Sequence, residues 1–99
     1  MGINSIHDEI AKRLAKKFKT RHRRKGVDLR FGDRAVEVAA TDGDLYQSMG
    51  QLRRSRKPKK YLAVPRELEQ RAKELTKGTG IGVMGPTGRI LKRTRRKRR

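Results

Sequence analysis

The sequence contains no cysteine, which excludes disulfides, zinc–thiolate sites and a thiol nucleophile. Aromatic residues make up only 4% of the 99 residues and hydrophobic residues 32%, which predicts one small domain with a modest core. No apolar run approaches the roughly 20 residues of a membrane span. The N-terminus also lacks the apolar segment of a signal peptide. These absences favour a soluble protein of the cytoplasm.

Acidic residues are scarce as well, with 10 Asp and Glu against 29 Lys and Arg and a net charge of +19. The tail from Lys92 to Arg99 holds seven of these bases. The rest of the chain still has 22 bases against 10 acids, a net charge of +12. A basic body as well as a basic tail predicts a polyanionic partner. DNA is favoured over a membrane surface, since a membrane-bound helix would show bulky aromatics, and a nucleoid location follows.

Two runs of alternating apolar and polar residues, at 27–31 and 34–39, are typical of β-strands. Gly32-Asp33 separates them, and glycine at the first position of a two-residue loop suits a type II′ hairpin turn. Such a turn fixes which residues face each other across the hairpin: Phe31 and Arg34, Leu29 and Val36, and Asp28 and Glu37.

Asp28 and Glu37 would then stand side by side, with Cβ atoms roughly 5 Å apart. Two facing carboxylates repel each other and cost stability. A divalent cation such as Mg²⁺ would offset the repulsion, because it prefers hard oxygen ligands. A salt bridge to Arg30 or Arg34 would offset it too, and the hairpin alone leaves both interpretations open.

Helical periodicity predicts two helices around this hairpin. The first spans residues 5–18, where apolar residues recur every four positions: Ile6, Ile10, Leu14 and Phe18, with Ala11 and Ala15 beside them. His7 is predicted to lie on its surface. The basic stretch at 19–25 could be a solvated loop or a strand leading into the hairpin, and the strand is favoured because Gly26 then makes the turn. The second helix opens at Asp42 or Asp44, either of which suits an N-cap, and Gln47 and Gln51 share one of its faces. Its predicted buried stripe is Leu45, Met49 and Leu52.

The remaining residues predict a strand, a helix and a small hairpin. Residues 61–64 are apolar, as in a buried strand, and Pro65 starts a third helix that ends at Lys77-Gly78. The predicted core stripe of this helix is Leu68, Ala72 and Leu75. Residues 80–85 match G-x-G-x-x-G, but they follow a helix, which excludes the dinucleotide motif. A terminal hairpin reaching residue 91 is expected instead, and the mixture of elements predicts an α/β or α+β class.

This order of elements resembles the PD-(D/E)xK nuclease superfamily, which includes restriction enzymes, archaeal Holliday junction resolvases and very-short-patch repair endonucleases. Gly26-Val27-Asp28-Leu29 resembles the strand with the family's first acid, and Val36-Glu37-Val38-Ala39 resembles its (D/E)-x-K strand. The resemblance implies an α/β, restriction-endonuclease-like αβββαβ core. That core is a mixed sheet flanked by helices, with an extra helix and a small C-terminal hairpin. Residues 1–91 would form one nuclease-like domain and residues 92–99 a basic tail.

The resemblance also implies a site. Asp28 and Glu37 would hold Mg²⁺ or Mn²⁺, and Glu9 lies where many relatives have a further metal-site acid. Gln51 lies on the helix that often places a glutamine near the metal. The position of the family's lysine is Ala39, which can neither bind a metal nor transfer a proton. The implied catalytic positions are thus Asp28, Glu37, Ala39 and Gln51.

A metal-dependent DNA endonuclease of repair, recombination or restriction is therefore expected, acting on duplex or branched DNA and, as relatives often do, as a homodimer. Ala39 leaves three explanations open: Gln51 substitutes for the lysine, the domain binds without cutting, or a mutation removed cleavage. Lysine or glutamate at position 39 would be expected to raise cleavage. The alternative is a non-catalytic nucleic-acid-binding protein, chromosomal or ribosome-associated. Such a protein would gain nothing from facing acids that repel phosphate.

The expected phosphate contacts fall in three basic segments, residues 12–25, 53–60 and 92–99, of which 53–60 is predicted to be a loop. The candidate nucleic-acid-binding residues are Lys19, Arg21, Arg23, Arg24, Lys25, Arg53, Arg54, Arg56, Lys57, Lys59, Lys60, Arg95 and Arg96.

DNA binding should therefore weaken steeply as salt is added. If about 6 phosphates are neutralised, log K against log salt should slope near −5 on duplex DNA. Deleting Lys92–Arg99 should weaken binding to all sequences alike, because an irregular basic tail contacts phosphates rather than bases. A salt titration that gave a slope shallower than about −2 would contradict this expectation.

Overall fold

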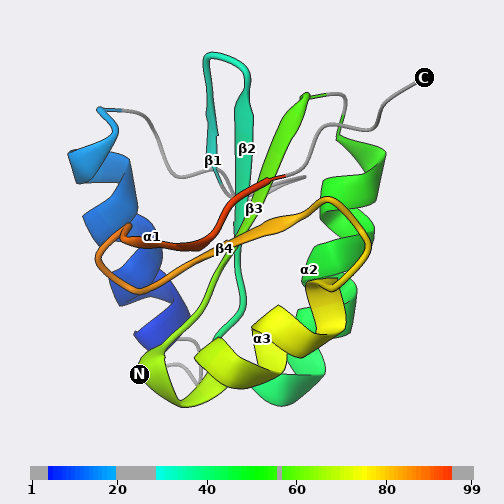
Figure 1. The fold of residues 1–99 in the computed structure, drawn as a ribbon. Coiled ribbons are helices and arrows are strands. Elements are labelled where there is room, and N and C mark those ends of the chain that lie inside the picture. The colour runs from blue at the N-terminus through cyan, green and yellow to red at the C-terminus, as the bar shows by residue number, and fades with distance from the viewer. Residues whose placement is uncertain (1–4, 20–28, 56, 95–99) are drawn as a thin grey trace.

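The computed structural model describes residues 5–19, 29–55 and 57–94. In chain order its elements are α1 (Ser5–Lys17), β1 (Leu29–Phe31), β2 (Arg34–Val38), α2 (Asp42–Arg54), β3 (Lys59–Ala63), the 3₁₀ turn η1 (Arg66–Leu68), α3 (Glu69–Thr76), β4 (Gly82–Met84) and β5 (Ile90–Lys92). The strands form one sheet in the order β1-β2-β3-β4-β5 (Figure 1). β2, β3 and β4 are parallel, while β1 and β5 run antiparallel to their neighbours. The predicted α/β class with a mixed sheet is confirmed.

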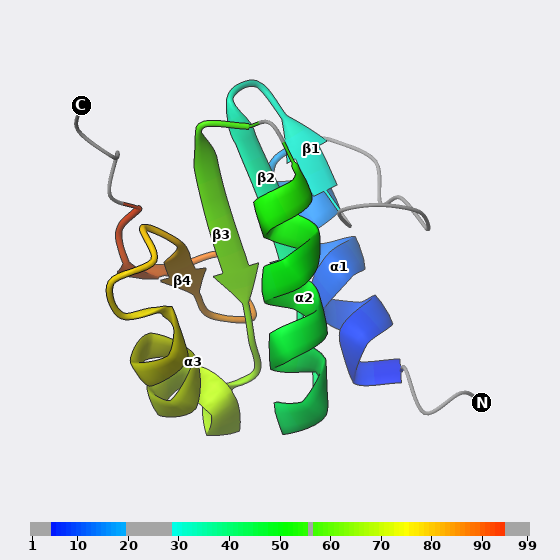
Figure 2. The ribbon, with the colours of Figure 1, turned by 90° about the vertical axis from the view of Figure 1, so that its right-hand side faces the viewer.

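Helices cover both faces of this sheet. α1 packs on one face, and α2 and α3 pack on the other (Figure 2). Side chains alternate along β2, so Val36 and Val38 join the core beneath α1, and Ala35 and Ala39 join the core beneath α2. The same alternation places Glu37 on the α2 side. Among the described residues, no helix is both long enough and apolar enough to cross a membrane.

The β1–β2 hairpin has the predicted register. Leu29 pairs with Val36, and Phe31 pairs with Arg34. Gly32 has a φ of 55° and Asp33 is not among the residues with positive φ, which is the combination of a type II′ turn. The α2–β3 connection holds this turn in place, since Lys57 Nζ donates to the Gly32 carbonyl at 2.7 Å.

The predicted apolar stripe of α1 is only partly correct. Ile10, Ala11 and Leu14 are buried, but Ile6 is 50% exposed. Positions four apart advance 40° beyond a full turn, because the helix has 3.6 residues per turn. A stripe with a strict spacing of four therefore turns away from the core, and His7 rather than Ile6 lies on the inner side.

The limits of α2 also differ from the prediction. Thr41 is the N-cap, and its hydroxyl accepts a hydrogen bond from the Asp44 N–H at 3.2 Å. The helix continues to Arg54 and β3 already begins at Lys59, so the prediction of a loop over 53–60 was wrong. Helical bonding continues into the start of the basic run, since the Ser55 N–H donates to the Gln51 carbonyl at 3.2 Å. The predicted buried stripe of this helix is confirmed: Leu45, Met49 and Leu52.

The terminal hairpin is part of the main sheet. β4 pairs in parallel with β3, and β5 closes the edge as the predicted hairpin partner. α3 ends at Lys77-Gly78 as predicted, but Pro65 leads first into η1. Of the three predicted core residues, Ala72 in α3 is buried, while Leu68 in η1 and Leu75 in α3 lie at the margin of the core. The predicted strand over 19–25 cannot be compared, because residues 20–25 lie outside the described residues.

Gly82 allows β3, β4 and β5 to approach one another closely. A Cβ placed there would lie 2.7 Å from the Lys92 carbonyl oxygen and 2.8 Å from the Tyr61 ring. Gly82→Ala should therefore lower the free energy of unfolding by about 1–3 kcal/mol through overpacking, as measured by urea denaturation. Gly50→Ala is the matched control, because its Cβ meets only the Arg54 side chain at 3.7 Å. It should stabilise α2 by about 0.5–1 kcal/mol, and equal effects of the two changes would contradict this packing.

Candidate functional site

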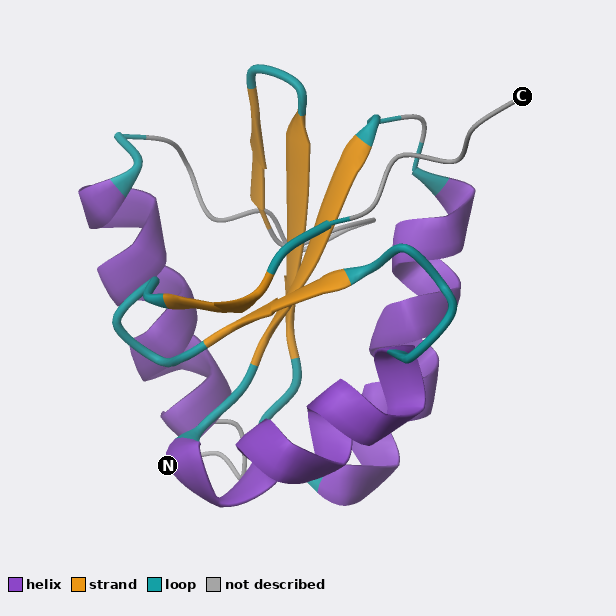
Figure 3. Ribbon diagram, viewed as in Figure 1, coloured by secondary structure: helices purple, strands orange, loops and turns teal. Residues whose placement is uncertain are grey.

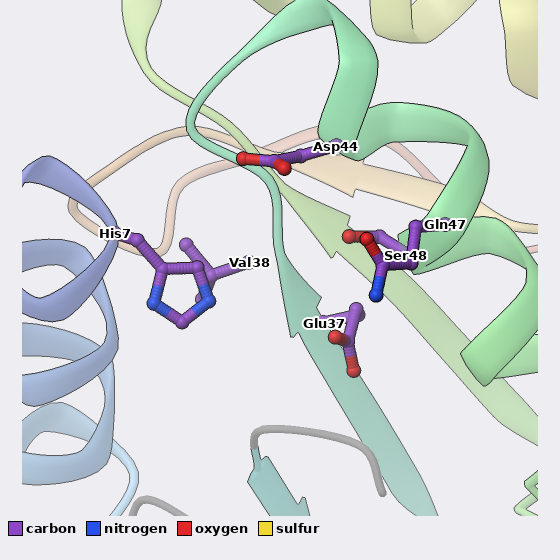
Figure 4. Close-up of a pocket in the computed structure, with 6 residues that line it drawn as sticks. All are labelled: His7, Glu37, Val38, Asp44, Gln47 and Ser48. Carbon is purple, nitrogen blue, oxygen red and sulfur yellow. The ribbon is translucent and has the colours of Figure 1, made fainter. Parts of the chain in front are cut away.

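A cleft of about 170 Å³ lies at the carboxyl end of β2. α1 contributes His7, β2 contributes Glu37 and Val38, and α2 contributes Asp44, Gln47 and Ser48 (Figure 4). Sites for whole organic ligands usually measure about 300–1,000 Å³. The cleft is therefore of a size for a hydrated ion or a phosphate group rather than a whole nucleoside.

Glu37 is the most deeply buried acid of this cleft, with 8% of its surface exposed. Glu37 lies on β2, and this strand is held on both edges, because β1 pairs with one edge and β3 with the other. On the β3 side Glu37 is in register with Leu62. A carboxylate with so little access to water is stable only beside a cation or hydrogen-bond donors. The sheet therefore fixes an acidic group at a defined point of the cleft.

α2 supplies three polar side chains because its first two turns run past the end of β2. Asp44 lies in the first turn that the Thr41 cap orders, and Gln47 and Ser48 follow three and four residues later on the same side. Ser48 is 4% exposed. Gln51, the predicted catalytic glutamine, lies one turn further along, is half-buried and does not line the cleft. Gln47 occupies the place that the sequence analysis gave to Gln51.

The predicted pair of Asp28 and Glu37 cannot be judged directly, because residue 28 lies outside the described residues. Glu9, the other predicted metal ligand, is exposed on α1 and does not line the cleft. Within the described ranges, no three His, Cys, Asp or Glu side chains are grouped closely enough to hold a metal ion. The oxygens of Glu37, Asp44 and Ser48 fit Mg²⁺ or Mn²⁺ in chemical kind. A complete site would need a ligand from elsewhere, and residue 28 is the expected one.

His7 is a cleft residue that the sequence analysis missed. It is half-buried and faces the cleft from α1, whereas a surface position was predicted. The signal was present in the spacing, because His7 lies one helical turn before Ala11 and two turns before Leu14. Both of these residues are fully buried.

Ala39, the position of the family's lysine, lies in the core and not in the cleft. It is 0% exposed, and its N–H donates to the Ala63 carbonyl at 2.9 Å. Its core cluster includes Leu45, Met49 and Val64. A lysine here would have to displace this packing before it reached a phosphate. Its first effect should therefore be on stability and not on cleavage.

The described basic candidates lie toward the end of the molecule that holds the hairpin turn. Arg53 and Arg54 end α2, Lys57 and Lys59 bind the hairpin turn, and this turn stands above the last turns of α1 and α2 (Figure 3). Lys60 follows in β3, and Lys19 is exposed just after α1. Glu37 in the cleft lies three residues beyond Arg34 along β2, a separation of roughly 10 Å. The other candidates lie outside the described residues: Arg21, Arg23, Arg24, Lys25, Arg56, Arg95 and Arg96.

Comparison with known proteins adds no assignment. No family model matches the sequence, and searches of curated proteins and of solved structures found no significant match.

The burial of Ala39 leads to a test of its own. Ala39→Lys should lower the free energy of unfolding by more than about 3 kcal/mol, because it places a charge in the apolar core beneath α2. The half-buried neighbour Ala40 is the control, and Ala40→Lys should change stability by no more than about 0.5 kcal/mol. Chemical denaturation measures both variants. A stable Ala39→Lys protein would mean that the side chain escapes toward the cleft.

Proposed function

We propose that this chain is a DNA-binding protein of the metal-dependent endonuclease type, with Glu37 as a metal-binding carboxylate. One observation supports this above the others: a buried carboxylate lies at the end of a central strand, in a small polar cleft. A purely structural acid would not need a cleft beside it. The hairpin register supports the proposal further, because it agrees with the prediction that led to the pairing of Asp28 with Glu37.

In this proposal the cleft receives a phosphodiester beside a metal ion. Glu37 and Asp28 would hold Mg²⁺ or Mn²⁺, and the bound ion would supply Lewis-acid chemistry toward a phosphodiester and a water molecule. The Ser48 hydroxyl and the Gln47 amide are hydrogen-bond donors for ligand oxygens or for ordered water. Val38 forms an apolar part of the cleft wall.

The basic residues near the hairpin turn contact DNA phosphates in the same proposal. Each DNA strand advances 3.4 Å per nucleotide along the helix axis. The roughly 10 Å between Arg34 and Glu37 thus corresponds to about three nucleotides of rise. A DNA strand that crossed the surface from the hairpin turn to the cleft would span a separation of this order. DNA is the partner proposed, with no role for a membrane.

A second function, DNA binding without cleavage, is favoured by one specific observation. Ala39 is fully buried, so this position supplies no group to the cleft. Losing one electrostatic contact to a reacting phosphate typically costs on the order of 10²–10³ in rate. Slow cleavage or none is therefore expected, and metal binding separates the two functions better than activity does.

Isothermal titration with Mn²⁺ tests the proposal. The unmodified chain should bind Mn²⁺ at one site that Glu37→Gln and Asp28→Asn each abolish while the fold is retained. Asp42→Asn is the matched control, since Asp42 is an exposed acid of α2 whose carboxylate pairs with Arg71 at 3.2 Å. It should leave the site intact.

Three results would count against the nuclease assignment. One is a Mn²⁺ site that survives Glu37→Gln. Another is unfolding of both acid variants, which would make the carboxylates structural. The third is tight DNA binding with no metal site and no cutting of plasmid or branched DNA, which would leave the binding protein as the function.

A further inference from the structure

We propose that His7 contacts the phosphate group that the cleft receives, from α1, and supplies a donor that position 39 does not provide. This inference rests on the proposed function and goes beyond it by assigning a residue that neither the motif nor the charge pattern indicates. Its basis is the position of His7 in the cleft together with the burial of Ala39.

The cleft has two walls of different origin. Glu37 comes from β2, and Gln47 and Ser48 come from α2 on the same side of the sheet, while His7 comes from α1 on the other side (Figure 4). Because α1 and α2 pack on opposite faces, His7 and the α2 residues approach a bound group from different directions. A phosphate between these walls would be held from two sides.

Phosphate oxygens accept hydrogen bonds, and the two acids of the cleft cannot donate them when ionised. The side chains with donor groups that line the cleft are the imidazole of His7, the amide of Gln47 and the hydroxyl of Ser48. Among the described lining residues, His7 is the one donor that comes from α1. Its donor is part of a rigid imidazole ring.

A role for His7 as a metal ligand is less consistent with the geometry. His7, Glu37 and Asp44 all line the cleft, yet no three such side chains are grouped as a metal site within the described residues. His7 therefore lies in the same cleft as Glu37 without sharing a ligand cluster with it and Asp44. The proposal therefore assigns His7 to the phosphate and leaves the ion to Glu37 and the acid expected at position 28.

The test measures binding of the dinucleotide TpT, which has a single phosphodiester, in the presence of Mg²⁺ by NMR titration. The ring C–H signals of His7 should shift as TpT is added. His7→Ala should raise the Kd for TpT about tenfold, because a hydrogen bond to a charged group is lost. His7→Gln, which keeps a donor, should recover part of the affinity. Ile6→Ala is the control, because Ile6 precedes His7 on α1 but is exposed and does not line the cleft.

Mn²⁺ titration of the same variants separates this proposal from the proposed function. Both His7 variants should keep the Mn²⁺ site that Glu37→Gln removes. An unchanged Kd for TpT in His7→Ala would overturn the role of His7 while leaving the metal site intact. Loss of Mn²⁺ binding in His7→Ala would make His7 a metal ligand. Unfolding of both His7 variants would make it a structural residue, and either result overturns the proposal.

Discussion

The position of β2 between β1 and β3 is the constraint on which the candidate site depends. Antiparallel pairing on one edge and parallel pairing on the other fix the strand in register. Alternation then directs Val36 and Val38 toward α1 and the odd-numbered residues toward α2. A shift of one residue would place Glu37 in the core beneath α1 and expose valine in its place. The register therefore protects both the core and the cleft.

The cleft exists because two helices, α1 and α2, meet at the end of this strand. α2 begins directly after β2, and its Thr41 cap fixes the first turn beside the carboxyl end of the sheet. α1 approaches from the other face. Its small residue Ala11 lies within the core on that face, one turn after His7. The polar residues of the cleft thus depend on packing that is almost entirely apolar, which holds them rigidly.

Local signals in the sequence were sufficient for most of the fold. The Gly32-Asp33 turn fixed the hairpin register, and the stripe of α2 followed from its period of 3.6. The sequence pattern was less informative about burial that depends on several turns of helix or on several strands together. A spacing of four placed Ile6 in the apolar stripe of α1, whereas the true helical period brings His7 to the inner side. The burial of Ala39 depends on α2, on β3 and on Val64 directly after β3, which no local pattern of β2 contains.

The same limit applies to the site. Glu37 could be identified from the alternation of its strand, and the structure places it in a cleft. Gln47 and Gln51 could not be separated by sequence, because both lie on one face of α2 and only their distance from the end of β2 distinguishes them. His7 joins the site through contacts distant in the chain. Sequence reasoning therefore gave the acid of the site more readily than its partners.

The central claim is that a divalent ion binds at the end of β2, and paramagnetic broadening by Mn²⁺ in an amide NMR spectrum tests it most directly. Substoichiometric Mn²⁺ should first broaden the amides of Glu37, Val38 and residues 44–48, and Glu37→Gln should remove this effect. Broadening that instead centred on the exposed acids of η1 and α3, or that persisted in Glu37→Gln, would contradict the account.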